Sequence, residues 1–439
     1  MLSLIIQMFA KGAAMMTIKP PIDYSTLPDR DIACLDIKSF YASVEAIARG
    51  VDPFKTAIAV VGNQDQKGSV ILAASPYMKT EFNLGTGNRL YEIPDIPDII
   101  LVEPRMELYM ERSLEIIDIY TSYVHPDDIF IYSIDESWLD LSKTEDRYGG
   151  TKKIIEKIRN EINYKYGLAC SVGVGPNMFL SKVAMDVEGK KTGYARWGYD
   201  DIKDKLWPLE VSEVWGIGKK TAAKFNKWGI YTMADVASRN PEFFKRRLGV
   251  VGVEIYRQAW GIDDSRPGGF YDDKRKSIGR GATLYRDYQK LEEIKTVIFN
   301  LSEDIGYRAR ELGLAGKTVS LYIRYSRNFH KKGFQAQQTL ESATNLEHEI
   351  MGAALELLNK KHQPGSPVRR LSVSLSNLLG EENIQLSLFQ NKEKKMKLAK
   401  TRDQIRKKFG PEKLDYGLSQ ADGSIRERLN SNIGGHKRK

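Results

Sequence analysis

Residues 129–141, IFIYSIDESWLDL, contain two strand-like runs that are separated only by Asp135 and Glu136. Apolar runs joined by so short a polar step are typical of a tight hairpin, so we expect both acids at its tip. For an isolated pair, a simple polar turn without chemistry is the commoner explanation. The segments on either side therefore decide what the hairpin belongs to.

The flanking segments supply the other elements of one small fold. DIACLDI (31–37) predicts a buried strand that ends near Asp36, and the following SFYASVEAIARG has helical spacing. Further elements are expected as a helix from Met106, a helix at 151–164, a strand at 168–175 and a helix from Asn177. Strand–helix–strand–strand–helix–strand is the order of the split βαβ, ferredoxin-like motif.

Three carboxylates come together if these strands adjoin in one sheet. Asp36 would then lie beside Asp135 and Glu136. Two or three acids suffice for a pair of Mg²⁺ ions, because hard cations prefer oxygen ligands and Mg²⁺ keeps waters and substrate phosphates in its other positions. The alternative is that Asp36 only caps the helix that follows it.

The remaining regions of the chain differ in their sequence patterns. Residues 56–104 predict a small irregular lobe of short strands, the region from 207 a helical domain, and 263–274 a linker. Beyond the linker we expect an α+β domain, with strands at 276–284, 317–325 and 368–378 and helices at 290–311 and 345–361. Residues 1–30 are interpreted as a loose extension, and the basic tail from 381 as a solvated helix or a flexible arm.

Composition limits the class of protein. The 439 residues are 41% hydrophobic and 28% charged, with no apolar run that could span a bilayer, so we expect a cytoplasmic protein of two to four domains. A net charge of +10 favours a polyanionic partner, although a solvated positive face would give the same value. Cys34 and Cys170 have no metal-ligand spacing, and the five histidines are scattered, so neither a zinc site nor a histidine triad is expected.

Five motifs occur in a fixed order along the chain. They are DIKSFYASVE (36–45), SIDESWLDLS (133–142), GVGPNMFLSKVAMD (173–186), VWGIGKKTAAK (214–224) and KSIGRG (276–281). Together they closely resemble the Y-family DNA polymerases over residues 30–410, and the tail resembles the bacterial UmuC-type branch.

This resemblance implies an α+β multidomain fold shaped as a right hand. Its parts would be an N-terminal extension (1–29), a ferredoxin-like palm (30–41 and 104–190), small fingers (42–103), a helical helix-hairpin-helix thumb (191–262), a linker (263–274), an α+β little finger (275–380) and a basic tail (381–439).

The resemblance also assigns roles to single residues. Asp36, Asp135 and Glu136 would be the catalytic, metal-binding acids, with the carbonyl of Ile37 as a further ligand and two Mg²⁺ ions, or Mn²⁺, as cofactors. Tyr41, next to Phe40 in the nucleotide site, would be the steric gate, an aromatic ring that collides with a ribose 2′-hydroxyl. Tyr77 and Lys182 would contact the triphosphate. A half-buried aromatic and an ordinary surface lysine are the alternatives for Tyr41 and Lys182.

One position departs from the family pattern. Thr80 stands where the family has an arginine, three places after Tyr77. Lys79 is adjacent, but on a helix it is expected to point elsewhere. Triphosphate contact by the fingers would be weaker, or Lys79 or Arg89 would take it over.

DNA and clamp contacts are implied outside the palm. Gly216, Gly218 and Lys219 would bind a phosphate in a helix-hairpin-helix, although a plain helix connection is the alternative. On the little finger, the DNA contacts would be Lys276, Arg280, Arg369 and Arg370. The alternative is that these side chains lie on an exposed sheet face and bind no DNA. The pentapeptide QLSLF resembles a sliding-clamp (β subunit) motif through Gln385, Leu386, Leu388 and Phe389; its alternative is a last element packed on the little finger.

The implied activity is error-prone translesion synthesis, in which a templated dNTP is added to a primer 3′-OH. Partners would be primer-template DNA, dNTPs, the clamp and accessory proteins of the SOS response, with no membrane. A non-catalytic DNA- and clamp-binding scaffold is the main alternative; Thr80 supports it and the intact acids argue against it. A nucleotidyl cyclase would share the palm but would have neither the hairpin domain nor the clamp-like peptide.

Overall fold

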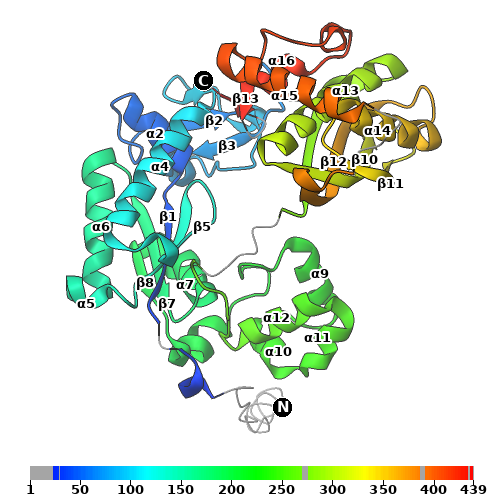
Figure 1. Ribbon diagram of the computed structural model, residues 1–439. Helices are drawn as coiled ribbons and strands as arrows, with labels where there is room; N and C mark the ends of the chain where they lie inside the picture. Colours follow the sequence, from blue (N-terminus) through cyan, green and yellow to red (C-terminus); the bar gives the residue numbers. More distant parts are fainter. Residues whose placement is uncertain (1–22, 29, 269–274, 386–390, 434–435, 439) are drawn as a thin grey trace, which may run out of the picture. The chain divides into compact units, whose positions relative to one another are not determined.

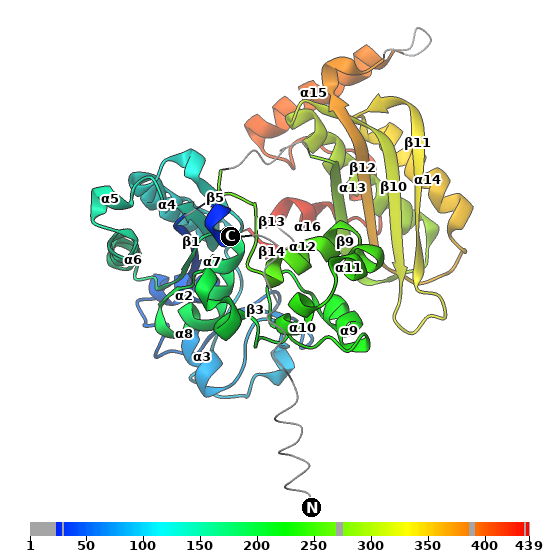
Figure 2. The ribbon, with the colours of Figure 1, turned by 90° about the horizontal axis from the view of Figure 1, so that it is seen from below.

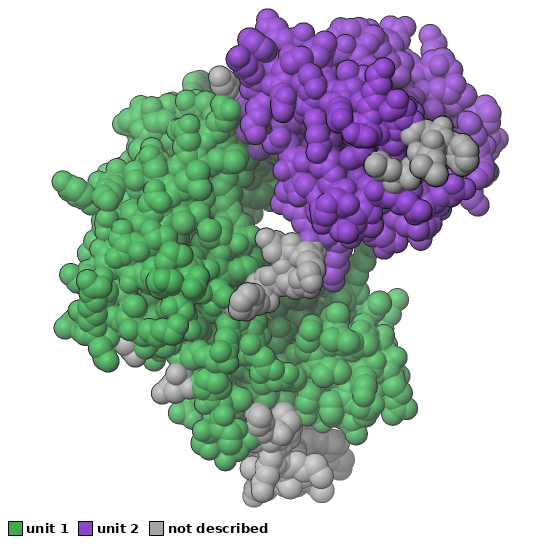
Figure 3. Space-filling view, in the orientation of Figure 1, with its two compact units in different colours: residues 1–271 green, residues 272–439 purple. Residues whose placement is uncertain are grey.

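The computed structural model describes residues 23–28, 30–268, 275–385, 391–433 and 436–438 (Figure 1). The chain forms two compact units, residues 1–271 and 272–439, which are coloured separately in Figure 3. The boundary lies inside the predicted linker. Over the described part of the chain, no helix is both long and apolar enough to cross a bilayer.

A five-stranded sheet forms the centre of unit 1, in the order β5-β6-β1-β7-β8. Its strands are β1 (Ile32–Ile37), β5 (Ile129–Ile131), β6 (Glu136–Asp140), β7 (Cys170–Gly175) and β8 (Tyr194–Arg196). Because β6 is antiparallel to both β1 and β5, the latter two are parallel and enclose it, which is the split βαβ arrangement. The predicted ferredoxin-like order is confirmed, with β8 added parallel to β7.

Helices cover both faces of this sheet (Figure 2). On one side are α4 (Met106–Tyr123), α5 (Glu145–Tyr148) and α6 (Thr151–Tyr166); on the other are α7 (Met178–Ala184), the π-helical turn η4 (Met185–Gly189) and α8 (Lys190–Thr192). The predicted helices from Met106, at 151–164 and from Asn177 are thus confirmed. Glycine lets α7 approach closely, because a Cβ on Gly173 would lie 2.2 Å from the carbonyl oxygen of Ser181.

The acidic hairpin differs from the prediction in one respect. Strand β5 ends at Ile131 and β6 begins at Glu136, so Glu136 is not at the tip but is the first paired residue of β6. The carbonyl oxygen of Glu136 accepts hydrogen bonds from the N–H groups of Tyr132 and Ser133, both at 3.1 Å, and these close the turn. Of the two acids, only Asp135 remains in the turn.

The lobe predicted at 56–104 is a three-stranded sheet in the order β3-β2-β4. It consists of β2 (Ile58–Val61), β3 (Ile71–Ala74), α3 (Pro76–Glu81), η2 (Leu90–Glu92) and β4 (Ile100–Val102). Helix α2 (Phe40–Ala48) connects it to β1, and Ala42 and Ala46 of that helix share a buried cluster with Ile58 and Val60. The predicted short strands are confirmed.

The rest of unit 1 is helical, as predicted. The short turn η3 (Pro126–Asp128) precedes β5. The helical part contains η5 (Tyr199–Asp201), η6 (Ile202–Leu206), α9 (Lys219–Lys227), α10 (Met233–Ser238), α11 (Pro241–Leu248) and α12 (Val250–Ala259). The N-terminal turn η1 (Tyr24–Thr26) packs on it: Tyr24 stacks on Tyr199, with ring centroids 4.6 Å apart, and donates a hydrogen bond to the carbonyl of Trp260. The interpretation of the first thirty residues as a loose extension is therefore wrong for 23–28.

Unit 2 contains a four-stranded sheet in the order β11-β10-β12-β9, with helices on one face (Figure 2). Its elements are β9 (Ser277–Tyr288), α13 (Leu291–Glu311), β10 (Leu314–Tyr325), β11 (Gly333–Thr344), α14 (Glu347–Lys361) and β12 (Val368–Gly380). All were predicted except β11. Its half-buried positions hold Phe334, Ala336 and Leu340 but also Gln338 and Ser342, so polar residues interrupt the apolar alternation that marks a strand in a sequence.

The tail does not match the predicted solvated helix or flexible arm. After η7 (Glu381–Asn383) it contains α15 (Lys392–Phe409), η8 (Gly417–Gln420), α16 (Arg426–Ser431), β13 (Asn432–Ile433) and β14 (His436–Lys437). From α15, the buried Arg402 reaches Glu347 of α14 at 2.8 Å, and the buried Arg406 reaches Glu303 of α13 at 2.6 Å. The prediction missed this because the acidic partners lie about 50 to 100 residues away in the sequence.

Replacing Glu347 by glutamine should destabilise unit 2. Arg310 and Arg402 both contact its carboxylate, so the variant removes one counter-charge from two buried guanidinium groups and leaves them to share Asp403, at a cost of about 3–5 kcal/mol. These partners hold the pKa of Glu347 at about 2, below its ordinary 4.5, against the effect of burial. The stabilisation is therefore present above pH 4.5 and is lost as the pH falls toward 2, so the difference from wild type should shrink between pH 6 and pH 3.

Urea unfolding of the full chain measures this effect. The matched control is Glu356→Gln on the same helix, where the carboxylate is exposed and lies 3.8 Å from Lys360. We expect a loss of less than about 1 kcal/mol there. Equal losses in the two variants would contradict the importance of the buried pairs.

Candidate active site

Strand pairing brings two of the predicted acids together. Asp36 of β1 and Glu136 of β6 are directly opposite, as are Cys34 and Trp138 two residues along. Directly opposed residues of an antiparallel pair project from the same face, so both carboxylates lie on the face that α7 covers. The third acid adjoins them, because the N–H of Ile37 donates a 3.0 Å hydrogen bond to the carbonyl of Asp135.

Burial makes the ionised form of Asp36 unfavourable. Burial raises the pKa of Asp36 from its ordinary 3.8 to about 6; Lys190 opposes the rise and the charge of Asp135 adds to it. The carboxylate of Asp135 accepts a 2.6 Å hydrogen bond from the hydroxyl of Ser133. Acids whose ionised form is disfavoured in this way are typical of functional sites.

Lys182 neutralises Glu136. Its ammonium lies 2.9 Å from the Glu136 carboxylate and 3.4 Å from that of Asp186, and its side chain is 6% exposed. The alternative of an ordinary surface lysine is therefore wrong. Within the described residues no three Asp, Glu, His or Cys side chains converge as a metal site, and Glu136 is engaged by Lys182 and by the thiol of Cys34 at 3.4 Å.

Sequence reasoning missed two further charged groups at this site. Lys190 lies 2.7 Å from Asp186 and 3.8 Å from Asp36. Lys182, Asp186 and Lys190 follow one another at spacings of four along α7, η4 and α8, so they share one side of this helical stretch. The spacing was visible in SKVAMDVEGKK and could have indicated them.

The predicted gate residue has a defined support. The ring of Tyr41, on α2, stacks on Tyr109 of α4 with centroids 4.4 Å apart and planes 14° from parallel. Phe40 is only 2% exposed, so its backbone rather than its ring is available to a ligand. The preceding Ser39 has a left-handed backbone (φ 50°), which turns the chain sharply from β1 into α2.

Helix α3 presents Lys79, and this corrects the expected direction of that side chain. The ammonium of Lys79 donates a 2.8 Å hydrogen bond to the hydroxyl of Ser39 at the start of α2, and burial lowers its pKa. Thr80 instead bonds back to carbonyls of its own helix, Pro76 and Tyr77, and Arg89 binds the carbonyl of Gly68. Tyr77 packs against the buried cluster formed by β2, β3 and α3, with its ring centroid 6.5 Å from that of Phe82.

The predicted DNA contacts of the helical region lie at the start of α9. Gly216 has φ +90°, a conformation that favours glycine, and Gly218 is the N-cap of α9, where an added Cβ would meet no atom within 4 Å. Both glycines are exposed, as is Lys219, the first residue of the helix. The backbone is therefore open to a ligand here.

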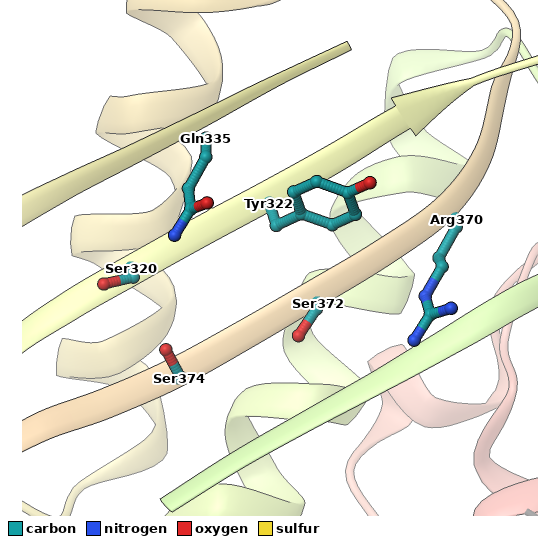
Figure 4. Close-up of a pocket in the computed structure, with 6 residues that line it drawn as sticks. All are labelled: Ser320, Tyr322, Gln335, Arg370, Ser372 and Ser374. Carbon is teal, nitrogen blue, oxygen red and sulfur yellow. The ribbon is translucent and has the colours of Figure 1, made fainter. Parts of the chain in front are cut away.

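In unit 2, the predicted arginines do not share one surface. Arg370 lines a hollow of about 210 Å³ on the helix-free face of the sheet, together with Ser320, Tyr322, Gln335, Ser372 and Ser374 (Figure 4). Arg280 lies opposite Val373, on the helix-covered face, and reaches Asp304 at 3.9 Å. Arg369 is 3.5 Å from Asp287, and Lys276 is exposed just before β9.

Most of the clamp-like pentapeptide falls outside the described residues. Gln385 is described and exposed, whereas Leu386, Leu388 and Phe389 are not described. The described flanks are anchored: Ile384 is buried beside Ala315 and Ala343, and Lys392 donates a 2.9 Å hydrogen bond to the carbonyl of Ala343.

Asparagine at Asp36 should stabilise unit 1 in a pH-dependent way. The folded-state pKa is raised, so folding is favoured by protonated Asp36 and this contribution disappears as the pH rises through 6. The rise from 3.8 to about 6 corresponds to about 3 kcal/mol, and the side chain is only 20% exposed. Unfolding at pH 4 to 8 should show the advantage of Asp36→Asn over wild type growing with pH.

Asp235→Asn provides a control of opposite sign. Hydrogen bonds from the N–H groups of Tyr231 and Thr232 outweigh burial and hold the pKa of Asp235 below its ordinary value. Asparagine there should lower stability at neutral pH, and the loss should shrink in acid. A flat pH dependence for Asp36→Asn would contradict the raised pKa.

Three family models match the chain in order. The impB/mucB/samB family matches residues 35–186, the IMS family HHH motif 199–230, and the impB/mucB/samB family C-terminal domain 275–388. The first match contains most of the acid-bearing sheet, the second contains the glycine turn before α9, and the third contains the sheet of unit 2.

Relatives match over nearly the whole chain. The UV-damage repair protein UvrX of Bacillus subtilis is 40% identical, covering 95% of this chain and 100% of its own, and DNA polymerase IV 2 of the same species is 34% identical, covering 93% and 99%. A Y-family DNA polymerase chimera has a similar fold, with a TM-score of 0.64 at 21% identity over 80% of this chain and 99% of its own. The chain therefore belongs to the impB/mucB/samB family, within the Y family of DNA polymerases.

Proposed function

We propose that this protein is a template-directed DNA polymerase of the translesion type, which adds dNTPs to a primer 3′-OH. The observation that carries the proposal is that strand pairing places the backbones of Asp36, Asp135 and Glu136 next to one another at one end of the β1–β6 pair, beside Lys182 and Lys190. Carboxylates and ammonium groups at one site suit a reaction between metal-bound phosphates.

The donor set fits divalent cations. Asp36, Asp135 and Glu136 would hold two Mg²⁺ ions, or Mn²⁺, with the carbonyl of Ile37 as a further ligand, and the raised pKa of Asp36 is what a cation would reverse. When bound, the ions would activate the 3′-hydroxyl and neutralise the leaving pyrophosphate. Glu136 must exchange Lys182 for metal, which would free the ammonium of Lys182 for the triphosphate.

Lys79 would take the place of the missing fingers arginine. Its ammonium already reaches Ser39 at the start of α2, and the charges of Asp36 and Asp135 act on it. Thr80 is turned back to its own helix, and Arg89 is bound to Gly68. With Tyr77 and the first N–H groups of α2, Lys79 would provide donors to the triphosphate.

Tyr41 would exclude ribonucleotides. The charge of Asp135 contributes, after burial, to the raised pKa of Tyr41, so the Tyr41 hydroxyl lies within electrostatic range of that acid. A ring fixed under the sugar collides with a 2′-hydroxyl, and so favours deoxynucleotides.

Two surfaces would hold the DNA backbone. In the helical region, Gly216, Gly218 and Lys219 leave N–H groups and charge open to a phosphate. In unit 2, Gly279 and Gly281 lie opposite Ser374 and Ser372 on the helix-free face, and these four small residues permit close approach of a backbone, with Tyr322 and Arg370 beside them. Lys276, which is exposed, would add charge, whereas Arg280 and Arg369 are held in ion pairs.

The pentapeptide from Gln385 to Phe389 would bind the sliding clamp, and accessory proteins of the SOS response are further proposed partners. These partners and substrates would place the protein in the cytoplasm.

Primer extension on an undamaged template with Mg²⁺ tests the central claim. The double variant Asp135→Ala/Glu136→Ala should lose extension by at least about 10³-fold, since the loss of ligands in a unit of interdependent groups removes most of the rate. Wild type should prefer dNTPs to ribonucleotides in the same assay.

Metal binding gives a readout besides activity. Mg²⁺ at pH 8 should raise the unfolding temperature of wild type but not of Asp36→Asn, because bound metal stabilises only the chain with the anionic ligand. The scaffold alternative makes the contrary prediction: DNA binding without extension, even with clamp present, and without this Mg²⁺ effect.

Lys79→Ala tests the replacement of the arginine. We expect KM for dNTPs to rise about tenfold with a smaller change in kcat, because an ammonium contact to the ground-state triphosphate is removed. Lys79→Arg should restore KM. The matched control is Thr80→Ala on the same helix, whose hydroxyl bonds only to Pro76 and Tyr77 carbonyls; an equal effect there would contradict the assignment.

A further inference from the structure

A buried polar cluster joins α2 to α4 directly behind the proposed gate. Tyr41, Glu45 and Arg49 occupy successive turns of α2 and so share one side of it, while Arg105 and Tyr109 are four residues apart at the start of α4. The side chain of Glu45 is fully buried, and Tyr109 is fully buried as well.

Glu45 is saturated with donors. Tyr109 donates a 2.7 Å hydrogen bond to one of its carboxylate oxygens, and Arg105 binds both oxygens in a fork, at 3.0 and 2.7 Å. Arg49 is a further partner. Although burial acts to raise it, these donors hold the pKa of Glu45 below its ordinary value, so the carboxylate stays charged and the bonds stay charge-assisted.

This cluster fixes the plane of the Tyr109 ring. Its hydroxyl end is held by Glu45, and its face lies 4.4 Å from the ring of Tyr41, nearly parallel to it. The other support of Tyr41 is the fingers core around Ile58 and Val60. Tyr109 therefore closes the side to which the Tyr41 ring would otherwise retreat from a bulky sugar.

We propose that Tyr109, locked by Glu45 and Arg105, is a positioning residue for sugar discrimination, because it holds the ring of Tyr41 rigid against a ribose 2′-hydroxyl. This inference rests on the proposed function. A steric gate excludes a ribonucleotide only if its ring cannot move aside. Stacking against an immobile, fully buried ring removes the rotation by which the Tyr41 ring would move aside. Tyr109 acts through Tyr41 and touches no substrate.

The test compares the ratio of kcat/KM for a dNTP to that for the matching ribonucleotide in single-nucleotide incorporation by the full chain. Tyr109→Met fills the space with a flexible side chain and removes the planar face. We expect the ratio to fall about tenfold, which corresponds to about 1.4 kcal/mol, mainly through faster ribonucleotide incorporation. Tyr109→Phe keeps the ring and should retain the ratio within about threefold, a difference of about 0.7 kcal/mol.

Two controls separate positioning from loss of stability. Tyr199→Leu breaks the other close tyrosine stack of unit 1, at 4.6 Å on Tyr24, and should lower the unfolding temperature without changing the ratio. Tyr41→Ala should abolish discrimination and show no further loss when combined with Tyr109→Met.

The outcomes distinguish the two proposals. A wild type that incorporates no nucleotide overturns the proposed function and this inference with it. A wild type whose discrimination is lost in Tyr41→Ala but kept in Tyr109→Met overturns this inference alone. Equal slowing of both nucleotides in Tyr109→Met also overturns it, since that result would indicate only a general structural role.

Discussion

The structure of unit 1 depends on one strand pairing, which places Asp36 and Glu136 opposite each other on the same face. Like charges directly across a ladder are unfavourable, and burial increases the cost. The fold compensates with ammonium groups from a single helical stretch: Lys182 on Glu136 and Lys190 near Asp36. That stretch approaches closely because Gly173 has no side chain. The arrangement of sheet and helix is thus inseparable from the charges that it holds.

Local pattern predicted the parts whose cause is local. The strand at 31–37, the acidic hairpin and the ferredoxin-like order follow from apolar runs and polar steps, and the structure confirms them apart from the place of Glu136 within β6. The acids of the site were found because they stand at strand ends. Features set by distant partners were not found. Arg406 looks like one more tail cation until Glu303 is known to face it, and the direction of Lys79 depends on Ser39, forty residues earlier.

The two units use one order of elements to different ends. The central sheet of unit 1 and the sheet of unit 2 both follow strand–helix–strand–strand–helix–strand, and each strand order interlocks two split βαβ units. In unit 2, however, the helices α13 and α14 cover one face only. The first sheet is covered on both faces and concentrates charge at a strand end. The second leaves a polar face open, with Gly279, Gly281 and serines where larger side chains would stand. The sheet of unit 1 suits a small reactive centre, whereas the open face of the unit 2 sheet suits a broad contact with a ligand.

The anchored ends of the pentapeptide segment have a mechanical consequence. Residues 385–391 connect the buried Ile384 to the buried Lys392, both tied to unit 2. Seven residues span at most about 25 Å even when fully extended, and here both ends are attached to the same body. A partner bound to this segment would therefore stay within a short distance of the folded unit. A load on that partner would be borne by the two flanking anchors, Ile384 and Lys392, and so by the edge of the sheet beside them.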